Sequence, residues 1–180
     1  MKQKIIIITP VPEMIQSFLS HTMARKAIEL DIVDLQIFNL RDYSNGKYRQ
    51  IDDTPFGGGP GMVMMAKPLF KALDDAIDKL DGIEGLNVLF PSPQGKIWNQ
   101  KIAQDYTKVE KLVVICGHYK GIDQRVIDKY VTDEYSIGDF VMSCGEIPAM
   151  MMIDSIVRLQ PGVLNDSESS KTDTFSSELL

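Results

Sequence analysis

Residues 135–175 read YSIGDFVMSCGEIPAMMMIDSIVRLQPGVLNDSESSKTDTF, and the order of elements in this stretch guides the interpretation of the whole chain. A short strand is expected at Tyr135–Ile137, followed by a loop with glycine at both ends, Gly138–Gly145. The apolar stretch Pro148–Leu159 has the length of a helix, and the Pro161–Gly162 pair ends it. The sequence therefore predicts a strand, a glycine-containing loop and a packed helix in succession.

The end of this stretch is polar. From Asn165 onward it is rich in serine and acidic residues, a composition typical of mobile segments. It carries the carboxylate of Asp173, close to an aromatic residue. Glu146, Arg158 and Asp173 are thus distributed around one helix and two loops, and this spacing needs an explanation.

The four consecutive isoleucines Ile5–Ile8 have the pattern of a strand that is buried on both faces of a parallel sheet. Strands alternate with helices along the chain, which predicts an α/β fold with a mostly parallel sheet flanked by helices. The polar connection Asn39–Gly61 is long, and long ordered loops are usually functional. The other predicted strands are 32–38, 87–90 and 112–116, and the predicted helices are 13–30, 68–80, 99–106 and 122–130.

Three glycine-containing loops follow predicted strands, at Pro91–Gly95, Gly117–Gly121 and Gly138–Gly145. In open parallel sheets, ligands bind outside the carboxyl ends of the strands. We therefore expect these loops to converge on one pocket.

Composition narrows the class of protein. The 180 residues suffice for one domain, and a net charge of -6 argues against the broad basic surface of a non-specific nucleic-acid binder, although a local basic patch or one on another domain would be compatible. The two cysteines indicate neither a disulfide framework nor a zinc site. The isoleucine run is too short for a secretory or membrane segment, so a cytoplasmic protein without membrane attachment is expected.

Several common site motifs are missing. Gly57–Gly61 reads GGGPG, which lacks the lysine of a P-loop and the spacing of a dinucleotide fingerprint. It suggests either a backbone that approaches a ligand closely or a surface turn. His21 and His118 belong to no metal-ligand cluster and are interpreted as a helix-surface and a loop residue. No nucleophile elbow of the G-x-S-x-G kind is present.

Five segments carry a family resemblance: IDDTPFGGGPGMVM (51–64), PSPQGK (91–96), CGHYKGIDQRV (116–126), SIGDFVMSCGEIPA (136–149) and DSIVRLQPGVLNDSESSKTDTFSSELL (154–180). In this order they resemble the bacterial tRNA (guanine-N(1))-methyltransferase family. The resemblance implies a SPOUT fold, with an α/β domain and a C-terminal trefoil knot. It also implies a homodimer that binds S-adenosylmethionine and methylates the guanosine 3′ of the tRNA anticodon.

The resemblance divides the chain into two parts. Residues 1–164 would form the S-adenosylmethionine-binding catalytic domain, and residues 165–180 a mobile lid that links to a further domain. The helical tRNA-binding domain of the family is absent from this sequence, so we expect weak tRNA binding by these 180 residues alone.

The resemblance assigns binding residues position by position. Mg²⁺ is implied as an accessory ion by resemblance alone, and no carboxylate cluster identifies a metal site. The residues near the target base would be Asp52, Asp53, Gly57, Gly58 and Gly59. The cofactor pocket would be lined by Phe90, Pro91, Ser92, Pro93, Gln94, Gly95, Gly117, Tyr119, Gly121, Ile137, Gly138, Phe140, Gly145 and Pro148.

The catalytic pair of the family falls on Asp173 and Arg158. Guanine N1 carries a proton and is a poor nucleophile until that proton leaves, so Asp173 is the expected general base. Arg158 would stabilise the negative charge that develops on the exocyclic oxygen. Closure of the loop around Asp173 is expected to desolvate the carboxylate and raise its pKa. Without the resemblance, Arg158 would be interpreted as a helix-end charge favoured by the dipole.

Three positions depart from the family pattern. Cys144 stands where glycine is common and could crowd the methionine end of the cofactor, while His118 and Lys120 replace a frequent arginine and glutamate. Two other functions stay open. One is a SPOUT RNA methyltransferase that acts on a ribose hydroxyl, and the other is a non-catalytic nucleotide-binding or dimerisation module. The GGGPG loop and the pair of Asp173 and Arg158 favour the guanine enzyme.

Overall fold

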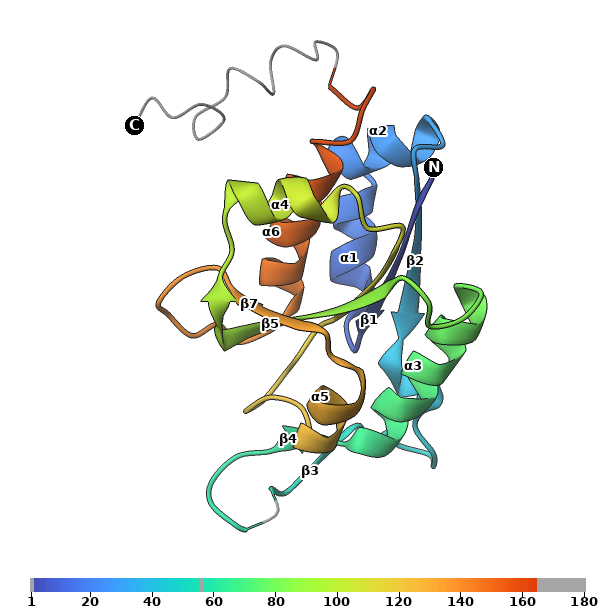
Figure 1. The fold of residues 1–180 in the computed structure, drawn as a ribbon. Coiled ribbons are helices and arrows are strands. Elements are labelled where there is room, and N and C mark those ends of the chain that lie inside the picture. The colour runs from blue at the N-terminus through green and yellow to red at the C-terminus, as the bar shows by residue number, and fades with distance from the viewer. Residues whose placement is uncertain (1, 56, 165–180) are drawn as a thin grey trace.

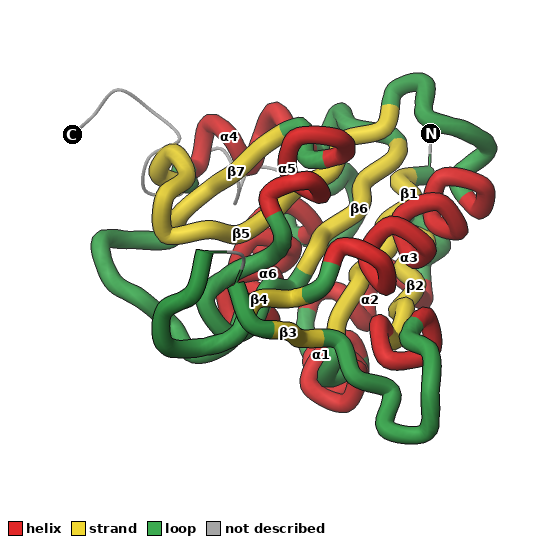
Figure 2. The backbone as a smooth tube through the Cα atoms, turned by 90° about the horizontal axis from the view of Figure 1, so that it is seen from below, coloured by secondary structure: helices red, strands yellow, loops and turns green. Residues whose placement is uncertain are grey.

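The computed structural model describes residues 2–55 and 57–164, so Asp173 and the predicted lid 165–180 lie outside the described residues. Five strands form one sheet in the order β2-β1-β6-β5-β7, and every pair in it is parallel (Figures 1 and 2). The mostly parallel α/β fold is thereby confirmed, whereas the trefoil knot stays a prediction. The strands are β1 Gln3–Thr9, β2 Val33–Asn39, β5 Leu86–Ile97, β6 Lys111–Ile115 and β7 Asp133–Ser136.

Helices cover both faces of the sheet, as Figure 1 shows. One face carries α1 Pro12–Leu19, α2 Met23–Glu29, α4 Gln100–Tyr106 and α6 Glu146–Val157, and the other carries α3 Ala66–Lys79 and α5 Gln124–Tyr130.

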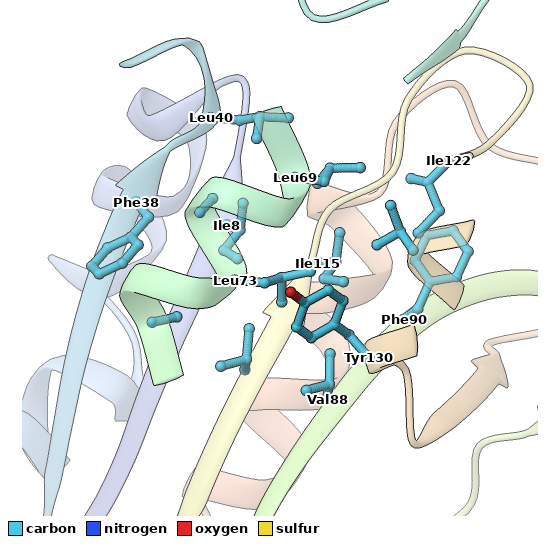
Figure 3. Packing of buried hydrophobic residues seen from close by; sticks show 14 of the residues in the cluster. Ile8, Phe38, Leu40, Leu69, Leu73, Val88, Phe90, Ile115, Ile122 and Tyr130 are labelled. Carbon is cyan, nitrogen blue, oxygen red and sulfur yellow. The ribbon is translucent and has the colours of Figure 1, made fainter. Parts of the chain in front are cut away.

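The isoleucines of β1 alternate between two hydrophobic cores. Ile5 and Ile7 pack in the core under α1 and α6, whereas Ile6 and Ile8 pack in the core under α3 and α5. All four are at most 1% exposed. Figure 3 shows Ile8 of the second core among side chains that come from α3, α5 and the neighbouring strands. This confirms the prediction of a strand buried on both faces.

The helix predicted for residues 13–30 is wrong as a single element. The chain leaves the helical conformation at Thr22, whose φ of -100° and ψ of -169° are extended, and α2 starts anew after it. The Thr22 hydroxyl accepts a hydrogen bond from the backbone N–H of Ala24 and thereby caps α2. The apolar spacing continues across this break, which is why periodicity alone did not reveal it.

The predicted loop Pro91–Gly95 is wrong as a connection between elements, because β5 continues to Ile97. Tyr135 of β7 pairs with both Pro91 and Lys96 of β5, so the four residues between them bulge out of the ladder. A Cβ atom on Gly95 would lie 2.5 Å from the carbonyl carbon of Glu134, so only glycine fits where the chain returns to β7. The bulge takes residues 92–95 out of the strand ladder.

The other helices lie close to their predicted positions. Helix α3 begins two residues before Pro68, and α6 begins at Glu146 rather than Pro148. The long connection 39–61 contains a short 3₁₀ turn, η1 Leu40–Tyr43, and the strand β3 Asp52–Asp53, which pairs antiparallel with β4 Val63–Met64. None of the helices in the described part of the chain has the length and apolar character needed to cross a lipid bilayer.

Candidate functional site

A cavity of about 470 Å³ lies at the carboxyl ends of β5, β6 and β7. The bulge of β5, the loop after β6 and the loop before α6 all contribute to its lining, so the predicted convergence of the three glycine-containing segments is observed. Gly95 and Gly138 do not line the cavity, and they instead allow close packing of the segments around it. The predicted cofactor residues that line the cavity are Phe90, Pro91, Ser92, Pro93, Gln94, Gly117, Tyr119, Gly121, Ile137, Phe140, Gly145 and Pro148.

Two glycines allow the loops to touch at the base of the cavity. The backbone N–H of Gly145 donates to the carbonyl oxygen of Gly117 at 2.7 Å, and His118 pairs with Cys144 in an antiparallel bridge. A Cβ atom on Gly145 would lie 2.4 Å from the Gly117 nitrogen, and one on Gly117 would lie 2.7 Å from the Phe90 ring. The close approach of the two loops therefore requires glycine at both positions.

A buried carboxylate joins three segments next to the cavity. Glu146 is 0% exposed, although it carries a charge. Thr9 Oγ1 donates to its Oε1 at 2.6 Å, and His118 Nε2 lies 2.7 Å from its Oε2. Burial acts to raise the pKa of Glu146, but the hydrogen bonds from His118 and Thr9 outweigh burial and hold it below its ordinary value.

The segment that contains the predicted substrate residues is attached to the loop after β6. Met64 of β4 donates its N–H to the Gly121 carbonyl and accepts the N–H of Asp123, both at 3.0 Å. Tyr119, which lines the cavity with a left-handed φ of 60°, has a pKa raised by burial and by the neighbouring Asp52. Asp52 therefore lies beside the cavity.

The other predicted substrate residues lie further out. Asp53 is exposed, and the glycines of 57–59 are exposed with positive φ values between 80° and 104°. No atom lies within 4 Å of a Cβ atom built on any of these three glycines. Glycine is needed at these three positions because of the backbone conformation, and not because described residues crowd them.

Arg158 lies away from the cavity, at the opposite end of α6. Gly145 and Pro148 line the cavity at the start of this helix, whereas Arg158 is its C-terminal cap, about 18 Å further along the helix axis. Two residues later, Gln160 Nε2 donates to the side chain of Gln3 at the start of β1, which marks the amino edge of the sheet. Within one chain, Arg158 and the cavity are thus on opposite edges.

Arg158 also has an electrostatic neighbour on α6. Burial raises the pKa of Asp154, and the positive charge of Arg158 partly offsets that increase. No group of three or more histidine, cysteine or acidic side chains suited to a metal ion occurs within residues 2–55 and 57–164.

Sequence reasoning missed several residues around the cavity. Cys144, His118 and Lys120 belong to loops that were predicted to converge but were not among the predicted cofactor residues, and all three line the cavity. Glu134 and Ser136 of β7 line it as well, which pattern analysis could not show because β7 pairs on both sides of the bulge. The burial of Glu146 gave no local signal, because acidic residues are common in the first turn of a helix.

The fold and the cavity define an α/β domain of the class that binds a small ligand at the carboxyl edge of a parallel sheet. The chain belongs to the family described as tRNA (Guanine-1)-methyltransferase TrmD, whose profile matches residues 3–180. This confirms the family resemblance that the five segments carry.

Individual relatives agree with this membership. The tRNA (guanine-N(1)-)-methyltransferase of Clostridioides difficile (strain 630) is 44% identical over 174 residues, which cover 97% of this chain and 75% of the relative. The tRNA (guanine-N(1)-)-methyltransferase of Staphylococcus carnosus (strain TM300) is 47% identical over 177 residues, which cover 98% of this chain and 71% of the relative. The crystal structure of tRNA (m1G37) methyltransferase from Aquifex aeolicus superposes with a TM-score of 0.84 at 34% identity, covering 92% of this chain and 73% of that one.

Proposed function

We propose that this chain transfers a methyl group from S-adenosylmethionine to N1 of the guanosine 3′ of the tRNA anticodon. Membership of the tRNA (Guanine-1)-methyltransferase family supports the reaction, and the m1G37 activity in the name of the Aquifex aeolicus protein supports the position. The observation that carries the proposal is the convergence of the three predicted cofactor segments on one cavity. Because tRNA is the proposed substrate, we also expect a cytoplasmic protein.

The cavity suits S-adenosylmethionine in size and chemistry. Its volume of about 470 Å³ lies within the range of small-molecule sites. Phe90, Ile137 and Pro148 offer apolar surface to an adenine ring, while Ser92, Gln94 and Glu134 add polar side chains to the lining. When bound, the cofactor supplies a methyl group on a positively charged sulfur. The chain then has to orient that methyl group and remove the proton from guanine N1.

We assign the proton transfer to Asp173, which lies outside the described residues, and charge stabilisation to Arg158. Loss of the N1 proton puts negative charge on the exocyclic oxygen of guanine. A guanidinium that donates hydrogen bonds to this oxygen stabilises the transition state more than the ground state. Mg²⁺ remains an expectation from the resemblance, because no site for it is found within the described residues.

The position of Arg158 favours a homodimer. The less buried stripe of α6 consists of Ile147, Met151, Asp154 and Arg158, which are spaced three to four residues apart and therefore lie on one side of the helix. Met151 is 54% exposed on it, so a large apolar side chain is available there for contact with a second copy. If two copies pack antiparallel along this stripe, the Arg158 of each copy comes close to the cavity of the other.

Methylation assays with matched tRNA transcripts test the function. One transcript carries guanosine directly 3′ of the anticodon, and its control carries adenosine there. We expect methyl transfer only to the guanosine, at N1, as mass spectrometry of the digested nucleosides would show. A ribose-methylated product would support the alternative SPOUT reaction, and binding of S-adenosylmethionine without methyl transfer to tRNA would support a non-catalytic module.

A further inference from the structure

The burial and the hydrogen bonds of Glu146 go beyond what an acidic residue at the start of a helix needs. An acidic residue in the first turn of a helix is stabilised by the helix dipole even when solvent surrounds it. Glu146 instead is fully buried, and burial of a carboxylate costs free energy unless donors compensate it. Its two oxygens are occupied by partners that lie 137 and 28 positions away in the sequence, Thr9 and His118.

The partners connect a rigid strand to the wall of the cavity. Thr9 ends the buried strand β1, and its hydroxyl also accepts the backbone N–H of Val11 at 2.9 Å. His118 lines the cavity between Gly117 and Tyr119, which line it too. Because an ionised carboxylate only accepts hydrogen bonds, Nε2 of His118 donates to Glu146. The loop after β6 is therefore tied to β1 through a carboxylate that itself does not line the cavity.

We propose that Glu146 is a positioning residue for cofactor binding, which acts through His118 on the loop 117–121. The inference rests on the proposed function, because it takes the cavity as the S-adenosylmethionine site. The charge of Glu146 makes its bond to His118 stronger than one between neutral groups, and this bond fixes the loop before the ligand arrives. Glu146 touches neither the cofactor nor the reacting atoms.

The first test is Glu146→Gln, which keeps the size of the side chain and removes its charge. The amide oxygen can accept from His118 and the amide N–H can donate to the Thr9 hydroxyl, so the variant removes the charge that strengthens the bond to His118. We expect the Kd of S-adenosylmethionine, measured by calorimetry, to rise about tenfold or more. The KM for the cofactor should rise to the same extent, whereas kcat at saturating cofactor should change little, because Glu146 positions the ground-state complex.

A stability control separates positioning from loss of structure. Gln3 is 3% exposed at the amino edge of the sheet, where its Nε2 donates to the carbonyl oxygens of Tyr106 and Val109. Gln3→Leu should lower the Tm and leave the Kd of S-adenosylmethionine unchanged. If Gln3→Leu weakened cofactor binding as much as Glu146→Gln, affinity would merely follow stability and the inference would fail.

A second pair of variants decides the case if Glu146→Gln does not fold. The His118 side chain is 19% exposed and tolerates exchange better. His118→Leu removes the donor and should raise the Kd about tenfold, while His118→Arg supplies a donor at the same position and should keep the Kd close to that of the unaltered chain. Equal binding by His118→Leu and the unaltered chain would overturn the inference. If the unaltered chain itself did not bind S-adenosylmethionine, the proposed function would be overturned instead.

Discussion

The backbone N–H of Gly145 donates to the carbonyl oxygen of Gly117 across 2.7 Å, which joins the loop before α6 to the loop after β6. This contact leaves no room for a side chain at position 145, where a Cβ atom would lie within 3.0 Å of three backbone atoms. The two loops can line one cavity only because they meet without side chains between them.

Gly145→Ala should separate the loops. We expect a loss of about 1–3 kcal/mol in the free energy of unfolding, as for other overpacked sites, together with cofactor binding weakened at least about tenfold. Urea denaturation and calorimetry measure the two effects. Gly82→Ala is the matched control, because Gly82 has a positive φ of 95° but no atom within 4 Å of a Cβ. It should reduce stability and leave cofactor affinity intact.

Arg158→Ala should reduce kcat about 10²–10³-fold, the usual effect of removing one stabiliser of developing negative charge. The Kd of S-adenosylmethionine should not change, since the proposed partner of Arg158 is the exocyclic oxygen of guanine and not the cofactor. Single-turnover kinetics and calorimetry give the two values. A tenfold loss of cofactor affinity would contradict the proposed role.

Mixing two impaired variants, at a cofactor concentration too low to saturate Gly145→Ala, tests whether each site uses the Arg158 of the partner. A dimer of Arg158→Ala with Gly145→Ala would keep one site that combines an intact cavity with an intact arginine. After random exchange of subunits, about a quarter of the activity should return, because half of the dimers are mixed and each has one working site. No recovery in a sample with demonstrated mixed dimers would place both groups of a site on one chain.

The stability of the chain in acid should depend on Glu146. Its pKa in the folded state is lowered by the bonds from His118 and Thr9, despite burial. The carboxylate therefore contributes stability above its ordinary pKa of about 4.3, and this contribution is lost as the pH falls through the lower folded-state pKa. Thermal melts from pH 7 to pH 3 should show a smaller decline for Glu146→Gln than for the unaltered chain. Parallel curves would show that Glu146 is not linked to folding.

Asp173→Asn should abolish the ionisation of the general base. We expect the single-turnover rate to fall by about 10²–10⁴-fold and its dependence on pH to lose the acid limb. Measurement over pH 5–9 with saturating tRNA and cofactor checks this. Retention of the acid limb in the variant would assign the proton transfer to another group.

Local patterns predicted the fold well where burial decides the structure. The isoleucines of β1 and the glycines before and after the strands indicated a parallel sheet with a site at one edge, and both are observed. Local patterns failed where contacts between residues far apart in the sequence determine the structure. The bulge of β5 depends on pairing with Tyr135, and the burial of Glu146 depends on Thr9, neither of which leaves a local signature.

The place of Arg158 in the fold was also beyond prediction. The family resemblance put Arg158 in the catalytic pair, yet nothing in its spacing indicates that α6 carries it to the opposite edge of the sheet. That separation follows from the length of α6 and from the bond between Gln160 and Gln3.

The bulge of β5 separates the wall of the cavity from the strand ladder. Strand pairing with β7 is complete on both sides of residues 92–95, because Tyr135 pairs with the residue before them and the residue after them. Lengthening or shortening the segment Ser92–Gln94 would thus alter the depth of the cavity without shifting the register of the sheet. A substitution within Ser92–Gln94 would thus act on the ligand site alone, while the sheet keeps its register.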